Sequence, residues 1–314
     1  MMKVLVCIPH FFGRTEGTNT SQLGSASAAA DERASIFGQA IRGLSSLFLN
    51  RINLGTTGQV SEGIGMICND HAEVMETSLT GDIYVVTSGS SHLFDRVSSG
   101  AVAKQISSRR TPTHLGYSCL EMFAASVEAY DLFMFIEDDI LIHDDKFFQK
   151  MASFYEQFGE DVILSPNRYE FWGRKDVAWK VYIEGDAPPS MRVPHQATWR
   201  TDLSLSTNYG SATLSIARNP MSACFVITRN QVKRWMEWPD FQRPDPVMQS
   251  TMLVLEAVQL PLAGRLPIYK PVQPNASFLE VHHLPNRLSG MKTPSQKIRK
   301  IAGENIASRA KTRS

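Results

Sequence analysis

A short apolar segment that ends in three consecutive carboxylates constrains the fold of this chain more than any other stretch. Residues 132–136 form a continuous hydrophobic run with aromatic and β-branched members, which is typical of a buried strand. Glu137, Asp138 and Asp139 follow directly, and residues 140–142 are apolar again. Three neighbouring carboxylates repel one another, and a hard divalent cation relieves that repulsion. Open α/β sheets bind ligands at the carboxyl ends of their strands, so a metal site is expected here, with a solvated acidic turn as the alternative.

Strand-like and helix-like segments alternate through the first half of the chain. Strands are expected at residues 3–8 and 83–86, because both are short apolar runs. Helices are expected at residues 32–50, with Asp31 as the N-cap, and at residues 115–130, because their apolar residues recur at helical spacing. This alternation indicates βαβ units. We therefore expect an α/β fold with a mostly parallel, Rossmann-like central sheet flanked by helices.

The second half has a less regular pattern. Asp145 is a suitable N-cap for a helix beginning at Lys146, and a short strand is expected at residues 161–165. Residues 168–211 are rich in Trp, Tyr, Pro and charge without a clear period, so irregular structure or a β-excursion is expected there. Further elements are expected as strands at 212–216 and 223–228, helices at 230–238 and 246–259, and extended segments at 266–269 and 278–282.

Composition is that of an ordinary globular protein. The 314 residues are 43% hydrophobic and 20% charged, with a formal net charge of +1, so charge gives no reason to expect a nucleic acid partner. No apolar run approaches the ~18 residues of a transmembrane helix. The four cysteines are far apart and fit reduced thiols in a cytoplasmic protein, namely Cys7, Cys68, Cys119 and Cys224.

The acidic segment and the elements around it resemble the GT-A glycosyltransferases, which use nucleotide-sugar donors. The resemblance rests on residues 133–139, whose Glu-Asp-Asp ending is similar to a variant of the family's Asp-X-Asp motif. It implies that Asp139 binds Mn²⁺ or Mg²⁺, and that Glu137 and Asp138 contact the ribose and the donor sugar. It also implies transfer of a hexosyl or N-acetylhexosaminyl group from a nucleotide-diphosphate donor, most often a UDP-sugar, to a hydroxyl acceptor such as a glycan.

The resemblance implies two further roles late in the chain. His282 and His283 follow an extended segment at the place where many family members supply a second metal ligand, and we take His283 as that ligand. Asp245 precedes an expected helix where inverting members carry their general base. Asp245 is equally well explained as a helix N-cap, and Asp240 and Glu256 are alternatives for the base.

The resemblance also assigns donor-binding residues in the first half. Pro9 and His10 end the first strand, which in the family holds the nucleobase and ribose. Arg33 is a candidate for a phosphate or base contact, although a lone arginine at a helix start usually faces solvent. Arg109 and Arg110 precede the expected donor-binding helix, and arginine is suited to bidentate phosphate recognition. Exposed arginines without such a role are common.

The resemblance covers most of the chain and predicts its organisation. We expect one catalytic domain over residues 1–290, with a nucleotide-binding half at 1–140 and an acceptor half at 141–290, followed by a basic tail at 291–314. One competing hypothesis is a non-catalytic nucleotide- or glycan-binding protein on the same fold. A sugar-nucleotide pyrophosphorylase would instead have a Gly-rich loop after the first strand, and a phosphohydrolase would have denser His and Asp clusters.

Overall fold

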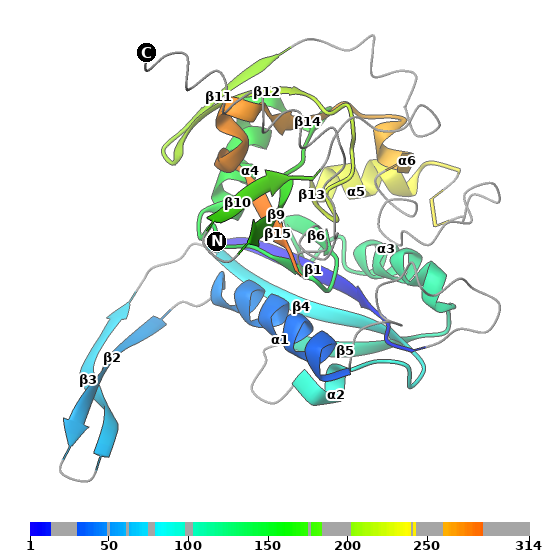
Figure 1. Ribbon diagram of the computed structural model, residues 1–314. Coiled ribbons are helices and arrows are strands. Elements are labelled where there is room, and N and C mark those ends of the chain that lie inside the picture. The colour runs from blue at the N-terminus through cyan, green and yellow to red at the C-terminus, as the bar shows by residue number, and fades with distance from the viewer. Residues whose placement is uncertain are drawn as a thin grey trace, which may run out of the picture.

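A computed structural model describes the chain over most of its length (Figure 1). The described residues are 1–13, 30–48, 51–60, 63–74, 79–97, 103–174, 177–183, 202–239, 241–242 and 260–284. The helix expected at 246–259 and the basic tail at 291–314 lie outside them. No helix in these described ranges is both long and apolar enough to cross a membrane.

A five-stranded sheet forms the centre of the molecule, in the order β13-β6-β1-β4-β5. Strand β1 runs parallel to both of its neighbours, and β4 runs parallel to β5, whereas β13 pairs with β6 in the antiparallel sense at one edge. The fold class is therefore α/β with a mainly parallel, Rossmann-like core, as expected. The strands are β1 (Met2–His10), β4 (Leu79–Ser88), β5 (Ala103–Ser108), β6 (Leu132–Ile136) and β13 (Cys224–Thr228).

Helices cover both faces of this sheet, and the alternation of side chains along β1 shows how. Val6 and Ile8 belong to one buried cluster together with Phe37 of helix α1 (Ala30–Ser46), whereas Cys7 belongs to a second cluster with Phe123 of helix α3 (Leu115–Ala125). Successive residues of a strand point to opposite faces, so α1 and α3 lie on opposite sides of β1, below and above it in Figure 1. Helix α4 (Phe147–Phe158) joins the α1 side, and α5 (Arg229–Met236) joins the α3 side.

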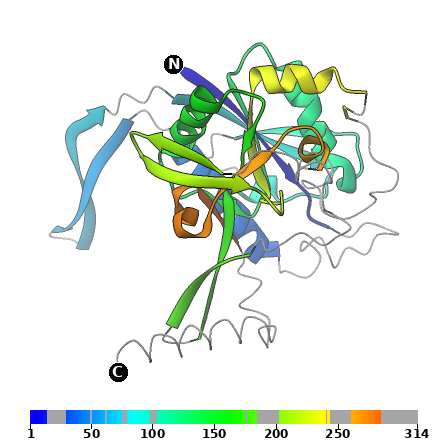
Figure 2. The ribbon, with the colours of Figure 1, turned by 90° about the horizontal axis from the view of Figure 1, so that it is seen from above.

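Two four-stranded sheets lie beside the central one, ordered β10-β9-β15-β7 and β11-β12-β14-β8. The first brings residues 280–283 next to the acidic segment, because β15 pairs with β7, which begins directly after the three acids. Long strands β9 and β10 run outward together in Figure 2. The strands of these sheets are β7 (Ile140–Leu141), β8 (Ile163–Leu164), β9 (Asn167–Arg174), β10 (Val177–Tyr182), β11 (Leu203–Thr207), β12 (Gly210–Ile216), β14 (Ile268–Pro271) and β15 (Glu280–His283).

The part of residues 168–211 that is described is β-structure, so the β-excursion is confirmed there and irregular structure is not. Two strands had no counterpart in the sequence prediction and form an antiparallel hairpin, β2 (Arg51–Val60) and β3 (Gly63–Val74). Edge strand β5 was also missed. Short helices not mentioned so far are α2 (Phe94–Val97), η2 (Pro112–His114), α6 (Leu260–Ala263) and η6 (Gln273–Phe278).

The two predicted helix caps are wrong in detail. Asp31 lies inside the first turn of α1, where it pairs with Arg96 at 3.0 Å. Before α4 it is Asp144, not Asp145, whose carboxylate accepts the backbone N–H of Lys146 at 2.9 Å. The N-cap of α4 is Lys146, two residues after Asp144, so the local turn and not the residue type decides which aspartate binds the backbone there.

Glycine is required at one position of α1 by a close approach to the strand that follows the acids. A Cβ on Gly43 would lie 2.3 Å from Cδ1 of Leu141, whereas one on Gly38 would meet first the end of the flexible Arg42 side chain at 3.2 Å. Both substitutions to alanine gain the same helix propensity, up to about 1 kcal/mol. Only Gly43→Ala forces Leu141 to move.

We therefore expect Gly43→Ala to be about 1–3 kcal/mol less stable than Gly38→Ala, because the added Cβ overpacks the half-buried contact with Leu141. Urea denaturation of the two variants and the wild type measures the difference. Equal stabilities for the two variants would show that α1 and β7 do not approach as closely as described.

Candidate functional site

The ends of two neighbouring strands bring His10 and the acidic segment together. Strands β1 and β6 are parallel, with Cys7 opposite Phe135. His10 lies three residues beyond Cys7, and Asp138 lies three residues beyond Phe135, so the register continued past β6 places them side by side. This is the carboxyl edge of the sheet, the edge at which open α/β folds bind their ligands.

His10 holds Asp138 through a defined ring nitrogen. Its Nδ1 lies 2.5 Å from Oδ2 of Asp138, and its Nε2 accepts the backbone N–H of Leu93 at 3.0 Å. A nitrogen that accepts a hydrogen bond carries no proton, so the proton is on Nδ1 and is donated to Asp138. The ring is fully buried and stacks on Phe37 of α1 at a centroid distance of 4.0 Å. His10 is thus fixed on both edges and one face.

Arg33 bridges the two aspartates from helix α1. Its Nη2 donates to Oδ1 of Asp138, and its Nη1 donates to Oδ2 of Asp139 at 3.1 Å. Arg33 lies one helical turn before Phe37, on the face that packs against the sheet, which explains why this arginine is buried rather than solvated. Burial alone would lower the pKa of Arg33, but the two carboxylates outweigh it and raise that pKa further above its ordinary value.

A second basic side chain, His283 of β15, lies next to the acids. Nε2 of His283 lies 3.6 Å from Oδ2 of Asp139, and its Nδ1 lies 2.7 Å from Oε1 of Glu170. Burial opposes the charged imidazole, yet Asp139 and Glu170 raise the pKa of His283 to about 9. For Asp139, burial is likewise outweighed by His283 and Arg33, which hold the pKa of that carboxyl well below its usual range.

Glu137 has a different environment from the two aspartates. Burial, followed by the charge of Asp139, raises its pKa to about 7. Its backbone N–H donates to the carbonyl of Ala223 at 2.9 Å, and Ala223 has φ of 55°, a left-handed conformation that is uncommon outside glycine. The three consecutive acids therefore have three different environments.

Two donor atoms around Asp139 fit a divalent cation. Oδ1 of Asp139 is buried and has no hydrogen-bond partner, and Nε2 of His283 faces the same carboxylate at 3.6 Å, beyond hydrogen-bond range. Within the part of the chain that is described, no group of three or more His, Cys, Asp or Glu side chains is arranged to hold a metal. A set of two protein ligands is what Mg²⁺-type sites commonly show when substrate phosphates complete the coordination.

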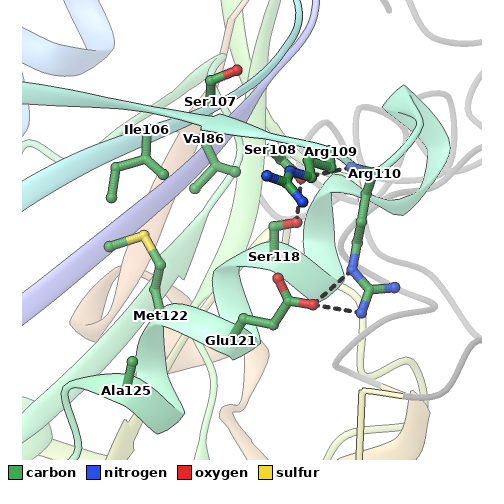
Figure 3. A pocket seen from close by; sticks show the side chains of 10 residues that line it. All are labelled: Val86, Ile106, Ser107, Ser108, Arg109, Arg110, Ser118, Glu121, Met122 and Ala125. Carbon is green, nitrogen blue, oxygen red and sulfur yellow. Dashed lines mark hydrogen bonds and ion pairs between the residues drawn. The ribbon is translucent and has the colours of Figure 1, made fainter.

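Arg109 and Arg110 follow the carboxyl end of β5 and lie apart from the acids. They lie at one end of a pocket of about 640 Å³ between β5 and α3, and none of the buried acids or their partners lines it (Figure 3). Nε and Nη2 of Arg110 both donate to Oε1 of Glu121, at 2.9 and 2.5 Å. Met122 and Ala125 form the apolar end of this pocket. The donor-binding roles of the two arginines remain predictions.

The predicted site residues are thus only partly gathered. Pro9, the residue before His10, is buried within β1. The buried acidic cluster, as we call it, contains His10, Arg33, Glu137, Asp138, Asp139, Glu170 and His283. Asp245, the predicted general base, and its alternatives Asp240 and Glu256 lie outside the described residues, so that assignment stays a prediction.

Glu170 was absent from the sequence prediction. It lies 2% exposed on β9 between two aromatic residues, Tyr169 and Phe171. Its only sequence signal is a carboxylate at an alternating position of an aromatic strand, which implies an acid pointing away from the aromatic face. Because the surrounding stretch had no clear period, that signal was not used.

Comparisons with known proteins identify no family for this chain. No protein-family model matches the sequence, and no curated protein matches it either. Among solved structures, a CMP:2-keto-3-deoxy-manno-octonic acid synthetase complexed with CTP matches with a TM-score of 0.40 and 11% identity, over 96% of this chain and 99% of that one. The S. aureus TarS structure matches with a TM-score of 0.40 and 10% identity, over 88% of this chain and 38% of that one.

Removing the Arg33 charge tests how far the cluster depends on it. We expect Arg33→Met to destabilise the protein by about 3–5 kcal/mol, because it leaves two buried carboxylates without their shared partner. Arg96→Met, which removes an exposed ion pair on the same side of the molecule, should change stability by no more than about 0.5 kcal/mol. Urea denaturation measures both, and similar small changes would mean that Arg33 does not compensate the acids.

The His283 ion pairs predict a dependence of stability on pH. The pKa of His283 is about 9 in the folded protein against 6.5 for the free side chain, so its contribution is complete below pH 6.5 and is lost as the pH rises through about 9. In metal-free buffer the unfolding free energy of the wild type should fall across this window relative to that of His283→Gln. Parallel pH profiles for the two proteins would contradict the assigned ion pairs.

Proposed function

We propose that this protein is a metal-dependent glycosyltransferase that moves a sugar from a nucleotide-diphosphate donor, most often a UDP-sugar, to a hydroxyl acceptor. One observation carries the proposal: at the carboxyl ends of the parallel strands, Oδ1 of Asp139 is buried without a hydrogen-bond partner, and the other oxygen of the same carboxylate lies 3.6 Å from Nε2 of His283. Most buried polar side-chain atoms in folded proteins have a hydrogen-bond partner, so an unpaired buried carboxylate oxygen calls for an explanation. The free oxygen favours a site that is completed by a cation and the ligand that comes with it.

Asp139 and His283 would hold the divalent cation, Mn²⁺ or Mg²⁺. Bound there, the cation would neutralise the negative charge of the leaving nucleoside diphosphate. Asp138 has a supporting task, because both of its oxygens are already engaged by His10 and Arg33. Arg33 also fixes one oxygen of Asp139, which leaves Oδ1 as the atom available for a ligand.

Glu137 supports the proposal as a group near the donor. Its raised pKa of about 7 means that, in the metal-free protein at neutral pH, the carboxyl exists in both protonation states. Such a group donates or accepts a hydrogen bond to sugar or ribose hydroxyls. The general base that takes the proton from the acceptor hydroxyl remains Asp245 in this proposal.

A thermal-shift panel of UDP-, GDP-, CDP- and dTDP-sugars, each with Mn²⁺, Mg²⁺ or EDTA, tests the proposal. We expect one nucleotide to raise the melting temperature only when the metal is present, because a ligand that binds the folded state stabilises it by mass action. Since the described part of the chain offers two ligands to the cation, the metal alone should give a much smaller shift than metal and donor together.

Asp139→Asn keeps the shape of the side chain and should abolish the metal-dependent shift. Asp145→Asn serves as the matched control, because Asp145 is a largely exposed acid that pairs with its neighbour Lys146 at 3.0 Å, and it should leave the shift unchanged. No shift for any nucleotide in the wild type would overturn the proposal. Donor binding without transfer to any acceptor and without donor hydrolysis would favour a non-catalytic binding protein.

A further inference from the structure

We propose that Glu170 is a positioning residue that acts through His283 and directs Nε2 of that imidazole to the cation site. The inference deepens the proposed function and rests on it. Glu170 contacts Nδ1 of His283, whereas the other ring nitrogen, Nε2, is the one nearest Asp139. Its effect on the site therefore passes through the histidine ring.

The sheet that contains β9 and β15 brings the two residues together. These strands are parallel neighbours, with His282 opposite Tyr169. His283 and Glu170 are the next residues along, so both point to the face opposite that of His282 and Tyr169. That face is turned to the acidic segment, as the 3.6 Å separation between His283 and Asp139 shows. The pairing of strands 113 residues apart thus supplies the carboxylate.

The contact between Glu170 and His283 is buried, so its loss could not be replaced by water. Glu170 is 2% exposed and His283 is 6% exposed. Oε1 of Glu170 lies 2.7 Å from Nδ1 of His283, which is the length of a charge-assisted hydrogen bond. An ionised carboxylate accepts and does not donate, so Nδ1 carries the proton in this contact. Loss of the carboxylate would leave a buried imidazole nitrogen without this partner.

The geometry assigns separate tasks to the two nitrogens of His283. Nδ1 is held by Glu170, so Nε2 is the nitrogen left to face Asp139. A histidine that binds a metal commonly donates its other N–H to a carboxylate, which fixes the tautomer and the ring orientation. Glu170 meets this requirement before any ligand is bound. The His10–Asp138 contact cannot do the same for a cation, because Nε2 of His10 is already engaged by Leu93.

The test combines metal affinity with the state of the His283 ring. Mn²⁺ affinity is measured in the presence of UDP, by electron paramagnetic resonance, for wild type, Glu170→Gln, Glu170→Ala, His283→Ala and the Glu170→Ala/His283→Ala double variant. We expect Glu170→Ala to weaken Mn²⁺ binding roughly 10–100-fold. Glu170→Gln, which retains an oxygen acceptor, should lose less. In the His283→Ala background the Glu170 substitution should have no further effect, because the residue acts through the ring.

Glu280→Gln is the matched control. Glu280 lies on the same strand as His283 but pairs with Lys180 and Tyr182, so loss of its charge should leave Mn²⁺ affinity unchanged. Unchanged Mn²⁺ affinity in folded Glu170→Ala would overturn the proposal. Additive losses in the double variant would also overturn it, because they would show that Glu170 acts independently of His283.

Histidine ¹⁵N NMR of the wild type gives a readout that needs neither a variant nor a metal. Above the pKa of His283, we expect its proton on Nδ1; a proton on Nε2 would overturn the proposal even where every Glu170 variant fails to fold. This arm also separates the two proposals. A wild type that binds no Mn²⁺ with any nucleotide, but keeps the proton on Nδ1, would refute the proposed function and leave the positioning of the ring by Glu170 intact.

Discussion

The guanidinium of Arg33, set across Asp138 and Asp139, is the interaction on which the rest of the site depends. Two carboxylates that are 6% and 5% exposed repel each other, and neither can be buried in the charged form without a compensating cation. Arg33 of α1 supplies that cation, and its two terminal nitrogens each donate a hydrogen bond to one of the two carboxylates. The helix packs on the sheet through Phe37, so the core of the protein and the geometry of the acids are coupled.

Parallel strand register decides which residues can join this cluster. The carboxyl ends of β1 and β6 are adjacent, so His10 and Asp138 lie within hydrogen-bond distance of each other. Strand β5 lies at the far edge of the same sheet, separated from β6 by β1 and β4. At about 4.8 Å per strand, its end is roughly 14 Å away from the acids. Arg109 and Arg110 are therefore placed with α3 and Glu121, in the pocket beside the edge strand.

The sequence was a good guide to the local part of the site and a poor one to its distant partners. The strand at residues 132–136 was predicted from its hydrophobic run, whereas the family resemblance placed His283 near Asp139, and the two side chains lie 3.6 Å apart. Glu170 could not be found in this way, because its role comes from the pairing of β9 with β15, a non-local event. The assignment of Asp145 as the cap of α4 failed for a local reason: Lys146 is the N-cap, and the turn before it directs the carboxylate of Asp144 to its backbone N–H.

The three acids differ in what surrounds them, and this difference argues against a uniform acidic turn. Asp138 has both oxygens engaged, Asp139 has one engaged and one free, and Glu137 has a carboxyl whose pKa is raised to about 7. A solvated turn would give three similar carboxylates with ordinary pKa values. The segment therefore has one acid with both oxygens engaged, one acid with an unpaired oxygen and one acid whose pKa is raised, rather than three equivalent solvated carboxylates. Of the three acids, Asp139 is the one that combines an unpaired buried oxygen with proximity to His283.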